Sequence, residues 1–454
     1  MAMIPIIKGV SKQISSINCT LTMTNATLKR TLTPLLLWGL GVGYVISGMY
    51  FGWNLGLEQG GTLGMALATI LVIVLYSCFS FSYAELACAI PKAGGAYDYA
   101  ERAFKKDIGF ITGLAQIIEF VFAPPAIAIA IGAYFHLAFP QVPILASSIV
   151  IYLIFTGLNI YGIKAAASFE LVVTVLAVGE LILFSSLTLP HFSLAHFTHN
   201  PLPHGMSGAF AAIPFAIWFF LGIEGVANVA EETINPQRVI LRGFGWALLT
   251  LVVLCFLVFV ASIGVGGWES IVYAVDGTSS DSPLPLALGH IFAADHVFYR
   301  LLIGIGLFGL IASFHGLLLA SGRATFEFGK IGNAPHFLGR VHKRFQTPAN
   351  ALLFNSLLGI IILCTGKTDQ IIIISVFGAL TLYAFSMLSV IKLRRTEPAL
   401  KRPFKVPFYP FTPFVALVLT IICIVALCYD NGVLSIYYFG ILLFFFLLFK
   451  IFKK

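Results

Sequence analysis

Charged residues are scarce in this chain of 454 residues. Asp, Glu, Lys and Arg make up only 10% of it, whereas soluble domains carry about 25%. Apolar residues account for 59% of the chain, and the mean hydropathy is +0.96. This composition excludes an ordinary soluble domain and predicts a membrane protein with many spans.

The sequence also lacks the residue sets on which enzymes and metalloproteins depend. It contains no nucleophile–base set, no phosphate-binding loop and no metal signature, and its seven cysteines lack metal-ligand spacing. We interpret the histidines at positions 191, 196, 199 and 204 as part of a solvated loop rather than a metal site. We therefore expect no catalytic activity, no cofactor and no bound metal, with a membrane-embedded enzyme as a distant alternative.

Long apolar segments dominate what is present. A membrane-spanning helix needs about 20 predominantly apolar residues, and by that measure the sequence predicts an all-α integral membrane protein with twelve spans. The expected ranges are 33–57, 63–90, 108–137, 143–161, 166–189, 208–231, 242–266, 298–321, 348–366, 370–392, 410–429 and 432–450.

The distribution of basic residues predicts the orientation, because Lys and Arg favour the cytoplasmic side of a membrane. With a cytoplasmic N-terminus, every Lys and Arg except Arg300 and Lys367 falls in a tail or loop on the cytoplasmic side. We expect a multi-pass protein of the plasma membrane, the inner membrane in a bacterium, with both termini cytoplasmic. We interpret the formal net charge of +8 as a consequence of this topology and not as nucleic-acid binding.

Two of the predicted spans are interrupted. The interrupting residues are Gly41, Gly43, Ser47 and Gly48 in span 1, and Gly222, Glu224 and Gly225 in span 6. Interrupted spans at corresponding positions are typical of transporters built from inverted repeats. We therefore expect a 5+5 inverted repeat with broken helices 1 and 6, in which residues 33–394 form the transport core. Residues 1–32 would form a cytoplasmic tail, and residues 395–454 would form spans 11 and 12 and a short C-terminus.

Three acidic residues, Glu119, Glu180 and Glu224, lie well inside predicted spans, and no Lys or Arg lies at comparable depth. A carboxylate at that depth costs at least about 2.5–3.5 kcal/mol. It must therefore pair with a cation or carry a proton, and a cationic substrate meets this need as well as a proton does. A protonated carboxyl group bonded to a nearby carbonyl is the structural alternative. His315 in span 8 is either a proton shuttle or a neutral structural histidine.

Aromatic residues surround Glu224 in the sequence. Trp218, Phe219 and Phe220 precede it, and Tyr44 lies on span 1. Aromatic faces attract a desolvated cation by about 2 kcal/mol, although such clusters are more often plain packing, and among these residues Trp218 is the one expected to act as a lid. In span 3, Pro124 and Pro125 follow Glu119 and predict either a polar niche or a simple kink.

Several stretches resemble the amino acid–polyamine–organocation superfamily of secondary transporters over nearly the whole chain. They are AELACAIPKAGGAYDYAERAF (84–104), which contains Glu85, GIEGVANVAEETINPQR (222–238) and GRATFEFGKIGNAPHFLGRVHKRFQTPANAL (322–352). Other stretches are similar to its ethanolamine permease branch, namely LGVGYVISGMYFGWNLGL (40–57), IIEFVFAPPAIA (117–128), NIYGIKAAASFEL (159–171) and SDSPLPLALG (280–289). The resemblance implies a LeuT-like fold and alternating access.

The resemblance also implies roles for single residues. Relatives that carry amino acids hold the α-carboxylate at a Gly-Ser-Gly break, where this chain has Ile46-Ser47-Gly48. The isoleucine would crowd that niche, which suits a substrate without a carboxylate, such as ethanolamine. By the family's spacing, Trp218 is the aromatic gate and Glu224 the amine-sensing or coupling acid.

We therefore expect a secondary transporter that imports ethanolamine, with an amino acid permease or exchanger of the same superfamily as the alternative. Coupling to protons stays open. The expected substrate-binding residues are Gly43, Tyr44, Ile46, Ser47, Gly48, Trp218, Phe219, Gly222, Glu224 and Gly225. The residues expected to serve coupling or the pathway are Glu119, Glu180 and His315. The expected partners are the small amine and membrane lipid.

Overall fold

The computed structural model describes residues 31–92, 94–161, 166–274 and 277–452, so most of the expected N-terminal tail lies outside the described residues. The described chain is all-helical and contains no β-strand. Its first helices are α2 (Pro34–Val45), α3 (Ser47–Tyr50), α4 (Leu55–Ala89), α5 (Ala96–Phe104), α6 (Lys106–Ala138), α7 (Ile144–Tyr161) and α8 (Ala166–Thr188). The middle of the chain forms η1 (Leu189–His191), α9 (Leu194–Phe197), α10 (Gly205–Ala211), α11 (Ile213–Trp218), η2 (Ile223–Glu232), α12 (Pro236–Gly266), α13 (Glu269–Val272) and α14 (Pro283–Gly289). The last helices are α15 (Val297–Lys330), α16 (Ala349–Leu363), α17 (Thr368–Thr396), α18 (Phe411–Asp430) and α19 (Gly432–Phe452).

Ten segments of the described chain are long and apolar enough to cross a membrane. Two shorter apolar helices, α2 and α16, lie where spans 1 and 9 are expected. The boundary expected between spans 1 and 2 is not a loop, because α4 continues across it with a kink at Gly61 (φ 61°). Glycine tolerates this conformation, which other residues rarely adopt.

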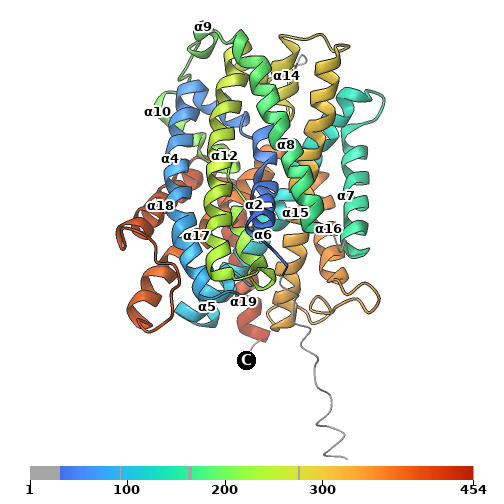
Figure 1. The fold of residues 1–454 in the computed structure, drawn as a ribbon. Coiled ribbons are helices and arrows are strands. Elements are labelled where there is room, and N and C mark those ends of the chain that lie inside the picture. Colours follow the sequence, from blue (N-terminus) through green and yellow to red (C-terminus); the bar gives the residue numbers. More distant parts are fainter. Residues whose placement is uncertain (1–30, 93, 162–165, 275–276, 453–454) are drawn as a thin grey trace, which may run out of the picture.

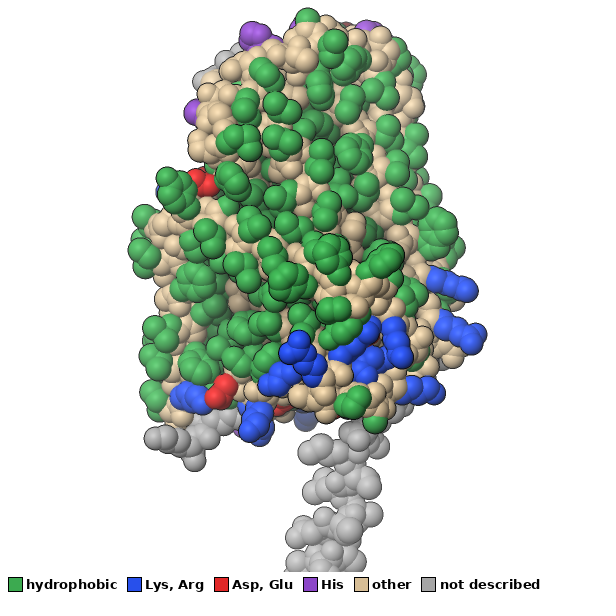
Figure 2. Space-filling view, turned by 90° about the vertical axis from the view of Figure 1, so that its left-hand side faces the viewer, with side chains coloured by type: hydrophobic (Ala, Val, Ile, Leu, Met, Phe, Trp, Pro, Cys, Tyr) green, Lys and Arg blue, Asp and Glu red, His purple; other side chains and the backbone are tan. Residues whose placement is uncertain are grey.

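The helices run roughly parallel and surround a buried centre (Figure 1). Among the long spans, α6 and α17 are the most deeply buried, and they pack against each other. Apolar side chains cover most of the face seen in Figure 2, whereas Lys and Arg gather at its lower end and His at the opposite end. We call the lower end the basic end. Its position agrees with the basic loops that the sequence assigns to one side of the membrane.

A buried carboxylate anchors the chain at the basic end. Glu85, near the end of α4, is 2% exposed and accepts from Arg394 Nε at 2.8 Å. Arg402 Nε lies 3.3 Å from the same carboxylate, and the Val406 amide N–H donates to it at 2.7 Å. Glu85 therefore ties the segment between α17 and α18 to α4.

Replacing Glu85 with Gln should lower the stability of the purified protein by about 3 kcal/mol, because it leaves two largely buried guanidinium groups without their counter-charge. Thermal melting in detergent micelles measures this loss. Glu397→Gln is the matched control, because it removes the Arg102–Glu397 pair, whose side chains are 41% and 33% exposed. Such an exposed pair is worth at most about 1 kcal/mol. Equal effects of the two substitutions would contradict the assignment.

At the opposite end, a long connection between α12 and α15 packs onto the start of α17. Within it, Asp281 is partly buried, and its Oδ2 accepts from Thr368 Oγ1 at 3.1 Å. Burial raises the pKa of Asp281 to about 6, the Thr368 hydrogen bond opposes this shift, and the charge of Asp369 adds to it.

A carboxyl group with a raised pKa stabilises the folded state through its protonated form. Its contribution is fully present below the unfolded pKa of about 3.9, and it is lost as the pH rises through about 6. Asp281→Asn should therefore be more stable than the wild type at pH 7.5, by at most about 3 kcal/mol because burial is partial, and the difference should shrink towards pH 4. Melting curves across this range test the expectation. Asp295→Asn, an exposed change in the same connection, should show no such trend.

Candidate functional site

Span 1 is interrupted between α2 and α3, at Ile46. The Ser47 amide N–H does not complete the helix ladder but donates to Ser313 Oγ of α15 at 2.9 Å. The Ser313 hydroxyl donates in turn to the Gly43 carbonyl at 2.6 Å. A side chain inserted into the ladder is a recognised cause of a helix break. Helix α2 runs through Gly41 and Gly43, so these glycines do not themselves interrupt span 1.

A second interruption, at residues 51–54, was not expected from the sequence. Phe51 is extended, and Gly52 adopts φ +85°, which favours glycine. The Gly52 amide N–H donates to Asn54 Oδ1 at 3.0 Å, and Asn54 Nδ2 donates to the Ser280 carbonyl at 2.8 Å. Asn54 thus satisfies the broken backbone and connects it to the segment before α14.

Span 6 is interrupted at the expected place. Helix α11 ends at Trp218, the chain turns through residues 219–222, and Gly222 adopts φ +96°. The chain then continues as the 3₁₀ helix η2, which carries Glu224. The prediction of broken helices in spans 1 and 6 is therefore confirmed.

Glycines allow the two interrupted spans to touch. Gly48 of α3 lies directly against the carbonyl of Trp218, and a side chain there would collide with backbone. Gly225 of η2 lies against the ring of Tyr44, where a β-carbon would approach the ring to 2.9 Å. The breaks predicted from separate parts of the sequence thus face each other.

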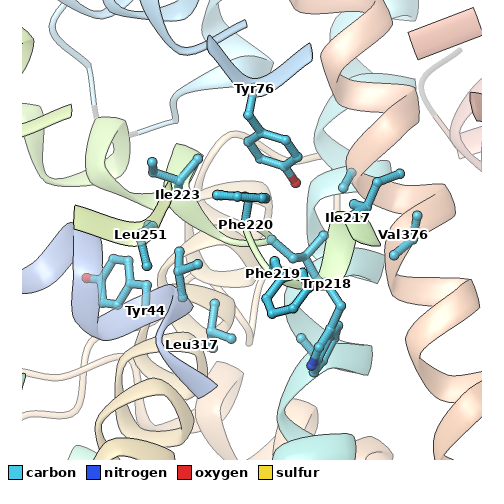
Figure 3. Packing of buried hydrophobic residues seen from close by; sticks show 14 of the residues in the cluster. Tyr44, Tyr76, Ile217, Trp218, Phe219, Phe220, Ile223, Leu251, Leu317 and Val376 are labelled. Atoms are coloured by element: carbon cyan, nitrogen blue, oxygen red, sulfur yellow. The ribbon is translucent and has the colours of Figure 1, made fainter. Parts of the chain in front are cut away.

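Aromatic rings fill the surroundings of the breaks (Figure 3). The Trp218 ring meets Phe51 edge-on at 5.5 Å between centroids, and Phe219 stacks on Trp53 at 5.4 Å. Trp218 is only 3% exposed, and its indole Nε1 has no hydrogen-bond partner among the described residues. Tyr44 lies apart from Trp218 and Phe219 in Figure 3, and its ring packs instead against Gly225, the residue that follows Glu224.

Glu224 and Glu119 lie side by side in a fully buried position. Tyr383 of α17 donates to Glu224 Oε2 at 2.8 Å, and its hydroxyl lies 2.9 Å from the Tyr76 hydroxyl. Within the described chain, no donor from another residue reaches Glu224 Oε1 or either carboxylate oxygen of Glu119, and a proton shared between the two acids is the only hydrogen bond open to these oxygens there. No ion pair with Lys or Arg reaches either acid in the described part of the chain. We call Glu119 and Glu224 the acid pair.

The prolines of span 3 do not interrupt it, because α6 passes through Pro124 and Pro125 as one helix. A side chain of α17 bonds to the α6 backbone beside the acid pair, since Ser375 Oγ donates to the Glu119 carbonyl at 2.9 Å. Gly378 lets α17 approach this turn closely. Close contact between α6 and α17 therefore holds Glu119 in place.

The other predicted pathway residues are not part of the acid pair. Glu180 accepts from the Tyr50 hydroxyl at 2.6 Å, and Tyr134 donates to the Tyr50 carbonyl at 3.1 Å. His315 Nδ1 lies 3.4 Å from Glu170 Oε2, and both side chains are buried. The sequence prediction did not include Glu170, because it lies only four residues after the start of predicted span 5 and gains its partner from the distant helix α15.

Open space lies on the basic-end side of the acid pair. A cavity of about 270 Å³ between α5, α6, η2 and α15 is lined by Gln116 and Asn228 among others. Gln116 Nε2 donates to Asn228 Oδ1 at 3.2 Å. Gln116 precedes Glu119 by one helical turn and Asn228 follows Glu224 by four residues, so the cavity is lined by the same two segments that carry the acid pair.

Replacing Gly48 with Ala should destabilise the protein by about 1–3 kcal/mol, because the new methyl group meets the rigid Trp218 carbonyl. Gly179→Ala on α8 is the control, since nothing lies within 4 Å of a side chain there. It should be neutral or stabilising by about 0.4–1 kcal/mol. Melting temperatures in detergent compare the two variants, and a neutral Gly48→Ala would disprove the close approach of the breaks.

The chain is similar to known membrane transporters over most of its length. It is 27% identical over 399 residues to an uncharacterised transporter of Rhizobium meliloti, covering 84% of this chain and 83% of the relative. It is 25% identical to a branched-chain amino acid permease of Bacillus subtilis (84% and 85% covered). It is 26% identical to a low-affinity putrescine importer of Escherichia coli (87% and 88% covered). The family model described as amino acid permease matches residues 32–450, and the chain therefore belongs to the amino acid permease family.

Proposed function

We propose that this permease imports a small organic amine, with ethanolamine as its substrate, across the plasma membrane by alternating access. The observation that carries the proposal is the acid pair, because Glu119 and Glu224 are fully buried beside the break of span 6 and have no basic partner among the described residues. Two buried carboxyl groups cannot both stay charged without a compensating cation. An ammonium group supplies that charge together with hydrogen-bond donors for the unpartnered oxygens.

In the proposed complex, the ammonium group meets Glu224 and the carbonyl groups freed where span 6 turns. Trp218 and Phe219 cover it as an aromatic gate, and the substrate hydroxyl meets Ser47. Gly48, Gly222 and Gly225 contribute by letting backbone come close to the substrate. Gly43, Tyr44 and Ile46 complete the set expected from the sequence.

The backbone of span 1 supports a substrate without a carboxylate. Free amide groups at a helix break form an anion site. Here the Ile46 amide N–H donates to the Val42 carbonyl at 2.8 Å, and the Ser47 amide N–H is taken by Ser313. The Ile46 side chain is also fully buried. These contacts favour an amino alcohol over an α-amino acid.

An amino acid or a diamine is the second candidate substrate. The relatives favour it, because their names include a branched-chain amino acid permease and a putrescine importer at similar identity. The acid pair also suits a diamine, since it offers two carboxyl groups in one place. These substrates therefore belong in the same experiment as ethanolamine.

We further propose a 5+5 inverted repeat in spans 1–10, with the basic end and both termini in the cytoplasm. The cavity behind Gln116 and Asn228 would then be the route by which substrate leaves for the cytoplasm. A membrane potential contributes about 2.3 kcal/mol per charge per 100 mV, so a cationic amine can accumulate without a second ion. Proton coupling through Glu224 is the next hypothesis.

Uptake of labelled ethanolamine by proteoliposomes tests the proposal. We expect saturable uptake and counterflow, weak competition by α-amino acids at equal concentration, and a decrease of about tenfold or more in Glu224→Gln, because a buried partner of the substrate charge is lost. Asp107→Asn, which changes a half-exposed carboxylate, is the control and should keep wild-type uptake.

Choline, amino acids and polyamines are added as competitors at two pH values. Equal competition by α-amino acids would contradict the argument from Ile46, and full uptake by Glu224→Gln would contradict the role of the acid pair. Full pH-dependent uptake in that variant would also exclude proton coupling through Glu224.

A further inference from the structure

A second pair of buried titratable groups lies outside the acid pair. Glu170 of α8 and His315 of α15 approach each other to 3.4 Å between Oε2 and Nδ1, with side chains 1% and 3% exposed. Glu170 Oε1 has no hydrogen-bond partner in the described part of the chain. Placing a carboxylate and an imidazole in this interior is costly unless they share charge or a proton.

The surroundings of the pair contain few other ionisable groups. Helix α2 contributes Tyr44, which interacts electrostatically with Glu170, and Arg323 and Glu232 act on the same tyrosine from farther along α15 and η2. Helix α7 contributes the apolar ring of Phe155, 6.0 Å from the His315 ring. The charged residues of α12, at positions 238 and 242, are exposed at the basic end. His315 is the ionisable side chain that acts directly on Glu170.

The pair is mechanically connected to the break of span 1. Glu170 packs directly against Gly43, whose carbonyl accepts the Ser313 hydrogen bond at the break. Ser313 lies two residues before His315 on α15. Gly316, the residue that follows His315, packs against the Tyr44 ring. One turn of α15 thus holds the break, the tyrosine and the imidazole together.

We propose that Glu170 and His315 form a proton-binding site that couples proton uptake to the movement of span 1. The inference rests on the proposed transport function and assigns coupling to this pair rather than to Glu224. With the proton bound, a charge-assisted bond between imidazolium and carboxylate joins α8 to α15 and holds Gly43 and the break between them. When the proton leaves, the imidazole is neutral and this bond weakens, so span 1 is freer to move against α15.

The geometry favours a proton over a larger ligand. Glu170 and His315 offer two side chains, whereas a structural zinc site uses four ligands and calcium takes six to eight oxygens. The Glu170 carboxylate and Thr174 both pack against Gly43, where a β-carbon would meet Glu170 Oε1 and lie 2.8 Å from Thr174 Oγ1. The close packing of Glu170 Oε1 against Gly43 leaves little room on that side for a ligand larger than a proton.

The test compares two transport modes of the full-length protein in proteoliposomes, using labelled ethanolamine and protein-free liposomes as background. Counterflow at equal pH on both sides needs no net proton movement. Uptake driven by an imposed pH gradient does need net proton movement. In this mode the membrane potential is clamped by valinomycin and equal potassium concentrations on both sides. We expect the counterflow rates of Glu170→Gln and His315→Gln to stay within about twofold of the wild-type rate. We expect their gradient-driven uptake to fall about tenfold below that of the wild type, which corresponds to a coupling free energy of ordinary size.

Two further variants separate coupling from structure. Glu170→Asp keeps a carboxyl group and should retain gradient-driven uptake with a shifted pH profile. His136→Gln removes a half-buried histidine that contacts the Val142 carbonyl at the far end of α6, and it should behave as the wild type.

Two results with the variants would overturn the inference: an unchanged response to the pH gradient in both Gln variants, or a loss of counterflow in these variants together with the loss of gradient-driven uptake. A third result would also overturn it, namely wild-type uptake that does not respond to the pH gradient although counterflow proceeds. The last result would leave the proposed transport function intact. Absence of counterflow with ethanolamine, amino acids and polyamines in the wild type would instead refute the proposed function itself and the coupling that rests on it.

Discussion

A helix broken inside a membrane must find partners for its freed backbone groups within the protein, because lipid offers none. The break of span 1 meets this constraint through Ser313, whose hydroxyl joins the Gly43 carbonyl to the Ser47 amide. Asn54 does the same for the second interruption. These few polar side chains allow the irregular backbones of spans 1 and 6 to meet. Two continuous helices would have no free backbone groups at this place.

Buried carboxyl groups impose the second constraint on this fold. Glu180 is bonded to a tyrosine, and Glu170 contacts a histidine through one of its two oxygens, whereas the acid pair keeps three oxygens without partners among the described residues. In the function and coupling proposed above, this difference distinguishes the acids assigned to structure or coupling from those assigned to substrate binding. The acid pair is the set of carboxyl groups that the protein leaves with unpartnered oxygens, and it lies beside the break of span 6. An external cation is the natural partner for such a pair.

Sequence analysis predicted the break of span 6 correctly because Gly222 and Glu224 interrupt an otherwise apolar run. It placed the break of span 1 too broadly, because Gly41 and Gly43 lie within a helix and allow close contact with neighbouring helices. The interruption depends on Ser313, which lies 266 residues beyond Ser47. No local pattern reveals such a distant insertion. Tyr383 was missed for the same reason, because a tyrosine in an apolar span gains meaning only from its distance to Glu224.

The sequence by itself determined the class of protein, since so apolar a composition is stable only in a membrane and the positions of Lys and Arg predict the orientation of the spans. It also determined which acids and glycines are unusual for their surroundings. The tertiary structure alone decided which of these residues meet. It placed Glu119 beside Glu224, and Glu170 beside His315, because contacts between distant spans depend on how whole helices pack and not on the residues next to each acid.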